Sequence, residues 1–176
     1  SIATDDTILI HDTSASALKK MTRANFVSGI GGTNTPAFQA KSSASQTVSS
    51  DSFTKIQCNT EAFDTAGAYD NSTNYRFTVP SGQAGKYYVY GLITANGLTN
   101  QNLDSANCSI YKNNSDTGGV EFYMHGNPTA RYLPVIQVTV LDLSVGDYVE
   151  LFGRIETDNG ADGKIGGTFG AYKIIE

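Results

Sequence analysis

The sequence predicts an all-β protein of the sandwich or barrel class, and two observations lead to this prediction. Short segments rich in Val, Ile, Tyr and Phe recur about every 10–15 residues, with turn-forming clusters between them. The composition agrees, since the chain has 18 Gly, ten Tyr and eight Phe with only 16% charged residues. Frequent glycine and aromatic residues with few charges are typical of a β protein and not of a helical or disordered chain.

Length and charge limit the possible functions. A chain of 176 residues makes one domain, or one domain with a small appendage. The net charge of −5 argues against a nucleic-acid partner, because phosphate binding needs clustered Lys and Arg. No apolar run reaches the roughly 18 residues that a membrane span needs, and no hydrophobic leader is visible at the N-terminus. A leader that was removed and a chain that never had one both fit this start.

The segment Tyr75–Gly91 holds two strand-like runs joined by a connection with one Pro and two Gly. The first run has one apolar and one polar face, as in an antiparallel sheet with one wet side. The second run is apolar on both faces, because Tyr87 and Val89 point one way and Tyr88 and Tyr90 the other. With no long helix to cover it, such a strand is expected to meet another subunit with one of its faces.

Seven further segments share this strand character. With the two runs of Tyr75–Gly91 they make nine candidates: Ala37–Lys41, Phe53–Asn59, Asn74–Pro80, Gly85–Ala95, Ala106–Asn113, Gly119–Gly126, Tyr132–Leu143, Gly146–Ile155 and Thr168–Ile175. Within the seventh, the apolar side chains of Ile136, Val138 and Val140 share one face. The segment Gly146–Ile155 also has a partly aromatic second face, which includes Phe152. The Ser-rich segment Lys41–Ser52 is expected to be a surface loop.

Residues 1–35 differ from the rest of the chain. Thr7–Asp12 and Ala17–Thr22 predict a hairpin, Thr22 is expected to cap one or two helical turns, and Gly29–Pro36 reads as a Gly-rich linker. A hairpin with a short helix buries too little surface to be stable alone, so it needs a partner. The apolar residues expected to make that contact are Ile8, Ile10, Met21 and Phe26.

Residues 36–176 resemble the C1q-like family, whose globular heads are related to tumour necrosis factor. The resemblance rests on a strand–turn–strand segment, a Gly-Asp turn with its following strand, a closing strand and an opening strand, in the family's order. These are Asn71–Pro80 (NSTNYRFTVP) with Gly85–Val89 (GKYYV), Leu143–Leu151 (LSVGDYVEL), Thr168–Ile174 (TFGAYKI) and Pro36–Phe38 (PAF). Two positions depart from the family pattern, where Asn74 and Ala171 stand in place of common glycines.

The resemblance implies a ten-stranded antiparallel jelly roll that assembles as a homotrimer and binds partners through surface loops. Together with the two-faced strands, it leads us to expect Tyr88, Tyr90 and Phe152 at the trimer interface. For receptor-binding loops the candidates are Tyr69, Tyr123, Tyr132 and Asn159.

The N-terminal residues resemble a module found in fibre and appendage proteins of tailed bacteriophages. Asp5–Asp12 (DDTILIHD), Ala17–Thr22 (ALKKMT) and Asn25-Phe26 carry this resemblance. It implies a structural protein of the virion, assembled in the host cytoplasm: a tail fibre tip or a head fibre. Residues 1–35 would bind other virion proteins, and the jelly roll would bind a host surface glycan or protein.

Catalysis has little support in the sequence. His11 and His125 lack any nucleophile motif around them, and no carboxylate pair has the spacing of an acid–base dyad. The one candidate metal site is a calcium loop with Asp158 and Asp162, because hard cations take several oxygens from one loop. The EF-hand pattern fails there, since its twelfth position is Phe169. We expect no enzyme activity and no cofactor, with calcium as the one alternative.

Three other functions stay open, one of them an enzyme that acts on host polysaccharide and would need an acidic pair in a cleft. A secreted C1q-like binding or signalling module predicts sugar on the sequons at Asn71 and Asn113. A capsid decoration protein without a receptor also fits. Cys58 and Cys108 are expected to be small buried hydrophobes, with a disulfide as the alternative, because a cysteine count alone gives no connectivity.

Overall fold

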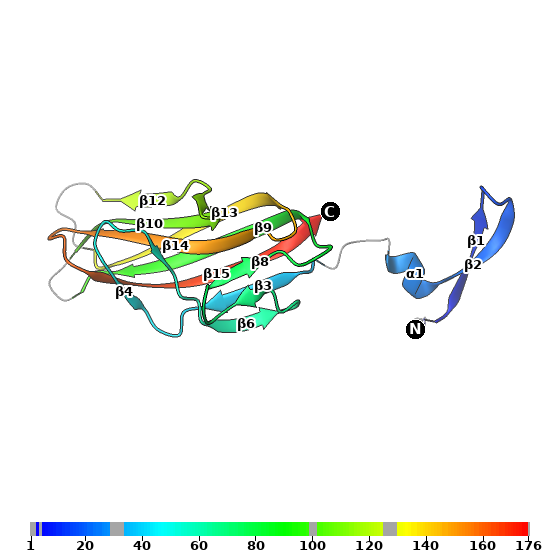
Figure 1. Ribbon diagram of the computed structural model, residues 1–176, viewed down its shortest axis with the longest axis horizontal. Helices are drawn as coiled ribbons and strands as arrows, with labels where there is room; N and C mark the ends of the chain where they lie inside the picture. Colours follow the sequence, from blue (N-terminus) through cyan, green and yellow to red (C-terminus); the bar gives the residue numbers. More distant parts are fainter. Residues whose placement is uncertain (1–2, 4, 29–33, 99–101, 125–129, 176) are drawn as a thin grey trace. The chain divides into compact units, whose positions relative to one another are not determined.

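The computed structural model describes residues 3, 5–28, 34–98, 102–124 and 130–175. The chain divides into two compact units, Ser1–Thr33 and Asn34–Glu176. The second unit is an all-β antiparallel sandwich of two sheets (Figure 1), as the sequence predicts. None of the described helices is long and apolar enough to cross a membrane.

The N-terminal unit contains strands β1 (Thr7–Asp12) and β2 (Ala17–Thr22) and the short helix α1 (Arg23–Ser28). The two strands pair antiparallel, with Ile8 opposite Met21. The Thr22 hydroxyl accepts a hydrogen bond from the backbone N–H of Asn25 at 3.2 Å, so the predicted helix cap is confirmed. Asp12 organises the hairpin turn, and its hydrogen bonds from Lys19, Ser14 and Ala15 lower the pKa of its carboxyl to about 2.

One sheet of the sandwich has six strands in the described part of the chain, in the order β13-β9-β15-β3-β6, with β4 beside β15. Its strands are β3 (Ala37–Lys41), β4 (Gln46–Val48), β6 (Thr60–Asp64), β9 (Gly85–Asn96), β13 (Tyr132–Leu143) and β15 (Gly163–Ile175).

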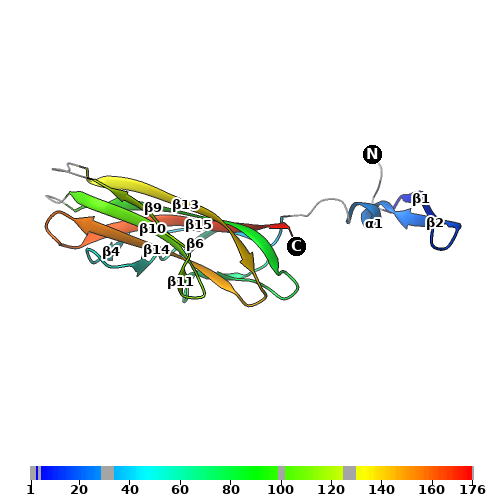
Figure 2. The same ribbon diagram turned by 90° about the horizontal axis from the view of Figure 1, so that it is seen from above.

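The other sheet has seven described strands in the order β11-β10-β14-β8-β7, with β12 beside β10 and β5 beside β14. These are β5 (Thr54–Lys55), β7 (Tyr69–Asp70), β8 (Arg76–Thr78), β10 (Leu103–Lys112), β11 (Ser115–Asp116), β12 (Val120–Tyr123) and β14 (Tyr148–Thr157). The long strands of both sheets run along the domain, with the β14–β15 turn at one end and the last residues of β15 at the other (Figure 2).

Three parts of the sequence prediction were wrong in detail. The Ser-rich segment Lys41–Ser52 is not only a loop, because it contains β4, whose Val48 is buried in the core. Most of Phe53–Asn59 is irregular, and only Thr54–Lys55 pairs with β14. The sandwich has thirteen described strands where ten are expected, because several additional segments pair over only two or three residues.

The core lies between the two sheets and has an aromatic centre. Phe38 is fully buried and stacks on Tyr69 and Phe77, with ring centroids 4.6 and 5.0 Å away, and meets the edge of Phe169 at 5.2 Å. These rings come from both sheets, so they fix how the sheets face each other. Cys58 and Cys108 are buried and unpaired in this core, and burial raises the pKa of their thiols to about 12 and about 11.

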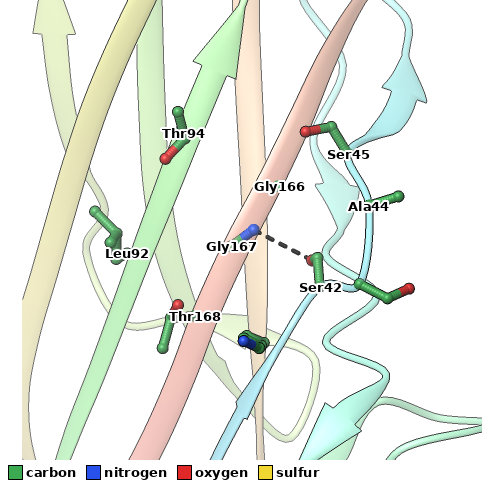
Figure 3. A pocket seen from close by; sticks show the side chains of 10 residues that line it. Ser42, Ala44, Ser45, Leu92, Thr94, Gly166, Gly167 and Thr168 are labelled. Atoms are coloured by element: carbon green, nitrogen blue, oxygen red, sulfur yellow. Dashed lines mark hydrogen bonds between the residues drawn. The ribbon is translucent and has the colours of Figure 1, made fainter.

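The two departures from the family pattern have local explanations. The left-handed backbone position is Tyr75 (φ 50°), not Asn74, whose side-chain amide donates to Asp70 Oδ2 at 2.7 Å. Ala171 faces the core, and its side chain is buried there. β15 has glycines at other positions where a Cβ would be too close: at Gly170 it would lie 2.3 Å from the Tyr90 hydroxyl oxygen, and at Gly167 it would lie 2.9 Å from the Leu92 carbonyl oxygen (Figure 3).

Candidate functional site

The outer face of the six-stranded sheet is apolar over its three long strands. The register places Val140, Tyr88 and Tyr172 in one cross-strand row and Val138, Tyr90 and Gly170 in the next. On β13 the exposed fractions are 59% for Ile136, 53% for Val138 and 54% for Val140. We call these three residues the β13 ridge. A row of exposed β-branched side chains is unusual for a monomer surface, so this face is the candidate interaction site.

Three tyrosines beside the ridge, Tyr88, Tyr90 and Tyr172, form what we call the tyrosine patch. The ring centroid of Tyr88 lies 5.3 Å from that of Tyr172 and 6.2 Å from that of Tyr90. Tyr90 lies flat over Gly170, and its hydroxyl accepts a hydrogen bond from Gln39 Nε2 at 2.9 Å. Ring contacts and this hydrogen bond therefore position the three tyrosines within the chain.

β13 is apolar on both faces, and Gln137 is the polar exception among the buried residues of its inner face, which include Leu133, Val135 and Leu143. Its polar Gln137 faces inward and is only 3% exposed, while its apolar ridge faces out. The Gln137 amide bridges the two sheets: Oε1 accepts from the backbone N–H of Ile110, and Nε2 donates to the Gly118 carbonyl at 2.7 Å. The hydrogen bonds of Gln137 thus account for its buried position. The exposed apolar side chains of the β13 ridge are not accounted for by contacts within the described part of the chain.

The apolar surface continues at the neighbouring edge of the sandwich. β13 is an edge strand of twelve residues that pairs only with β9 in the described structure. The adjacent β12 exposes Val120 by 44% and Phe122 by 53%. A long apolar edge strand that stays uncovered is prone to aggregation, so native proteins usually cover such an edge.

Of the three residues predicted for the trimer interface, the structure brings two together. Tyr88 and Tyr90 lie in the tyrosine patch, whereas Phe152 lies on the outer face of the opposite sheet. There Phe152 stacks on Tyr111 with ring centroids 4.1 Å apart, and Lys55 Nζ lies 5.8 Å from its ring centre. One flat contact cannot bury residues on both outer faces of a sandwich.

The predicted receptor residues are also dispersed. Tyr69 is a correction: it lies in β7, is 6% exposed, and its hydroxyl donates to the Cys58 carbonyl, so it belongs to the core. Tyr123 ends β12 and Tyr132 begins β13, with exposed fractions of 53% and 65%. Asn159 is exposed in the turn between β14 and β15. These three lie near the end of the domain that is opposite the chain's entry at Pro36.

The predicted calcium loop is built from turn contacts. Asn159 Oδ1 accepts from the backbone N–H of Ala161, and Asp158 Oδ2 accepts from the Asn102 amide at 3.0 Å. Asp162 is exposed. Among the described residues, no three His, Cys, Asp or Glu side chains are grouped so as to hold a metal ion. His125 lies outside the described residues.

The predicted attachment residues lie in the N-terminal unit. Ile8, Ile10 and Met21 are half-buried on one face of the hairpin, and Phe26 of α1 is 43% exposed. The other hairpin face also carries apolar side chains, because Leu9 and Leu18 are 67% and 70% exposed. The hairpin thus presents apolar residues on both faces.

Sequence reasoning missed Tyr172 and the role of the β13 ridge. The alternation in Tyr132–Leu143 was visible, but alternation alone does not say which face is buried. Tyr172 follows the aromatic Phe169 by three residues, so strand alternation places the two on opposite faces. That spacing was the available signal that Tyr172 would point away from the core.

No protein-family model and no curated protein matches this sequence. Solved structures match its fold, however. The globular domain of zebrafish complement 1qA has a TM-score of 0.52 and 20% identity, covering 80% of this chain and 98% of its own. The Eiger tumour necrosis factor of S. frugiperda has a TM-score of 0.56 and 14% identity, covering 80% and 92%.

A third structure is the vertex protein P5 of PRD1. Its TM-score is 0.59 at 15% identity, and the match covers 81% of this chain and 99% of that protein. At these identities the likeness concerns the fold alone. The sandwich of this chain is a C1q/tumour-necrosis-factor-like jelly roll preceded by an N-terminal hairpin.

Proposed function

We propose that this chain is a homotrimeric bacteriophage structural protein, a tail fibre tip or head fibre, that binds the host surface with its jelly roll. The observation that carries the proposal is the exposed apolar face formed by the tyrosine patch and the β13 ridge. Full burial of a Val or Ile side chain contributes about 1.5–3 kcal/mol. Covering the ridge with another copy therefore supplies a substantial driving force, from which the cost of association is subtracted.

The shape of the apolar surface favours a ring over a two-fold dimer. Each chain carries two different apolar regions: the flat tyrosine patch and the β12 edge with Val120 and Phe122. Two different regions suit a heterologous contact, in which the edge of one copy packs on the face of the next. Such contacts close into a ring where the rotation between copies allows it, and a ring of three copies agrees with the assembly implied by the C1q-like resemblance.

The virion location rests on two further points. The N-terminal hairpin has apolar residues on both faces and is too small to be stable alone, so it needs a partner. A fold match over nearly the whole of a vertex protein shows that this type of jelly roll occurs in a virion component. We therefore assign the hairpin to virion attachment and the jelly roll to the host side. Three weak sites on one trimer, and many trimers on one particle, would raise the effective affinity for the host.

Two experiments test this proposal. Immunogold electron microscopy of intact particles should place antibodies against the jelly roll at the tip of an appendage. Adsorption assays should show that the purified chain competes with particles for host cells. Labelling confined to the capsid surface, without competition, would instead support a decoration protein with no receptor.

The secreted C1q-like module makes a different prediction. It expects sugar on Asn71 or Asn113 when the chain is expressed in a secreting eukaryotic cell. Asn113 is poorly suited to glycosylation, since its amide donates to Asp147 Oδ1 at 2.8 Å and its carbonyl oxygen accepts from the Tyr148 N–H at 2.9 Å.

A further inference from the structure

The two strands of the N-terminal hairpin carry opposite charges. The acidic side chains lie on β1 and just before it: Asp5, Asp6 and Asp12. The basic side chains lie on β2 and at the start of α1: Lys19, Lys20 and Arg23. In the described structure Asp12 and Lys19 pair with each other at 2.6 Å, and the other four form no ion pair. The hairpin therefore has an acidic edge on the β1 side and a basic edge on the β2 side.

Both edges are open. β1 and β2 form a two-stranded sheet, and neither strand pairs with a further strand in the described part of the chain. Each edge thus presents a row of unpaired backbone N–H and C=O groups, which is a template for pairing with another strand. Leu9 and Leu18 share one face of this sheet and are 67% and 70% exposed. Additional strands would therefore complete the sheet and cover these side chains.

The charges decide which edges can meet. Pairing β1 with β1 of another copy, or β2 with β2, places like charges beside each other, which destabilises strand pairing. Pairing β1 with β2 of the next copy places opposite charges together. Within one hairpin the Arg23 N–H donates to the Asp6 carbonyl at 2.8 Å, so these residues lie at one level. In a three-fold ring whose strands run along the axis, Asp6 of one copy is then level with Arg23 of the next.

We propose that the three hairpins of one trimer pair edge to edge into a closed ring, with β1 of each copy antiparallel to β2 of the next. The contact joins two different edges, so it is heterologous, as a ring of three requires. Closure leaves no open strand edge, and it brings Leu18 of one copy within diagonal reach of Leu9 of the next.

The linker favours the ring once the jelly rolls have assembled. Residues 29–36 join α1 to β3, and a linker of this length holds the hairpins of one trimer at an effective concentration of about millimolar. This inference rests on the proposed homotrimer and names the partner of its hairpin. The ring, and not a single hairpin, is then the element that binds the virion.

Hydrogen exchange of the full chain, measured by mass spectrometry, tests the ring. In a single hairpin the outward N–H groups of β1 and β2 are open to water, whereas in the ring they donate to the next copy. Peptides from residues 7–22 should exchange about tenfold more slowly in the wild-type trimer than in Val138→Glu, because each outward N–H gains one hydrogen bond. This variant places a charge on the β13 ridge and should separate the jelly rolls.

Two charge variants show whether the contact lies between chains. Asp5→Lys with Asp6→Lys makes the acidic edge basic, and Lys20→Glu with Arg23→Glu makes the basic edge acidic, so each variant alone should lose the slow exchange. A trimer that contains both variants has opposite charges at two of its three contacts. Mixed trimers, purified through a different tag on each variant, should recover the slow exchange. A contact inside one chain predicts no recovery, since each chain still has like charges on both edges.

The matched control carries all four substitutions in one chain. It exchanges the acidic and basic edges, so its hairpins should show the slow exchange of the wild type.

Three results would overturn the ring. Wild-type trimers whose hairpins exchange as fast as those of Val138→Glu would leave the hairpin free for a virion protein, with the proposed trimer still standing. Slow exchange that persists in monomeric Val138→Glu would assign the protection to the same chain. Mixed trimers without recovery would refute the pairing of opposite edges. A monomeric wild-type chain would instead refute the proposed trimer itself, and the ring with it.

Discussion

The two outer faces of the sandwich both carry aromatic residues, but only one of them satisfies these residues internally. On the seven-stranded sheet, Tyr111 and Phe152 stack on each other, and the Arg76 guanidinium lies 4.3 Å from the ring centre of Tyr148. Arg154 of the same face pairs with Asp51 at 2.6 Å and with Glu121. On the six-stranded sheet, the three residues of the β13 ridge are each more than half exposed.

This difference shows that apolar patterning on an outward strand face has two meanings. On the outer face of the seven-stranded sheet, which we call the charged face, cations and neighbouring rings cover the aromatic side chains. These aromatic side chains therefore find their contacts within one chain. On the apolar face, the same strand alternation leaves Ile and Val side chains in water, and we propose that another copy covers them. We therefore leave Phe152 out of the proposed contact between subunits.

The largest expected effect is the loss of the trimer on placing a charge in the ridge. Val138→Glu would bury a carboxylate in the contact between copies, where it has no partner, so the variant should be monomeric. Val145→Glu is the matched control, because both valines are 53% exposed but Val145 lies in the β13–β14 turn. Light scattering measures the outcome. Dissociation by both variants, or by neither, would contradict the assignment of the contact to this face.

On the charged face, a substitution should change stability and not assembly. Glu150 is 1% exposed and pairs with Lys55 Nζ at 2.5 Å, while the Lys55 side chain is 33% exposed. Glu150→Gln removes the charge and should lower the free energy of unfolding by roughly 1–3 kcal/mol, less than for a fully buried pair because water reaches Lys55. Urea unfolding measures the loss. A monomeric Glu150→Gln protein would show that the charged face also takes part in assembly.

Acid should lower the free energy of unfolding by protonating Asp147, which lies in the β13–β14 turn. Hydrogen bonds from Asn113 and Ser144 and the ammonium of Lys112 lower the pKa of the Asp147 carboxyl from 3.8 to about 2. A lowered pKa in the folded state stabilises the fold above pH 3.8, and this stabilisation is lost as the pH falls from 3.8 to about 2.

Asp147→Asn should therefore cost about 1 kcal/mol near pH 6, after allowance for solvent screening, and less at pH 2. Urea midpoints at several pH values test this. An Asp147→Asn protein that loses the same stability at pH 2 as at pH 6 would refute the linkage.

The smallest effect is expected for the hydrogen bond between Gln39 and Tyr90 on the apolar face. Tyr90→Phe removes the hydroxyl that accepts from Gln39 and should reduce the free energy of unfolding by about 0.5–1.5 kcal/mol. The mass of the assembled protein in light scattering should stay the same. Gln39→Ala, combined with Tyr90→Phe in a double-mutant cycle, isolates this bond. A coupling energy of zero would mean that the ring packing over Gly170 alone positions Tyr90.

The sequence was sufficient for the fold class and for most long strands. β3 and β13 have the bounds that their alternation predicted, and β9 differs by one residue, because long strands with one or two apolar faces give a strong signal. β4 was missed because only Val48 marks it within a Ser-rich segment. Its pairing with β15 comes from chain connectivity, which local composition does not encode.

The candidate site was only partly predictable from the sequence, because some of its features also depend on contacts between residues that are distant in the chain. The two apolar faces of β9 revealed that Tyr88 and Tyr90 point away from the core. For β13, the inward position of Gln137 depends on the Ile110 N–H and the Gly118 carbonyl, which lie about 20–30 residues away in the chain. Tyr69 looked like a loop residue, and only the stacking on Phe38 shows that it belongs to the core.

The mass of the intact chain in solution tests the central claim most directly. Size-exclusion chromatography with multi-angle light scattering at micromolar concentration should give about 56 kDa, three times the chain mass of 18.7 kDa. A stable species of 18.7 kDa would contradict the account, because the tyrosine patch and the β13 ridge would then be exposed to water in the native protein.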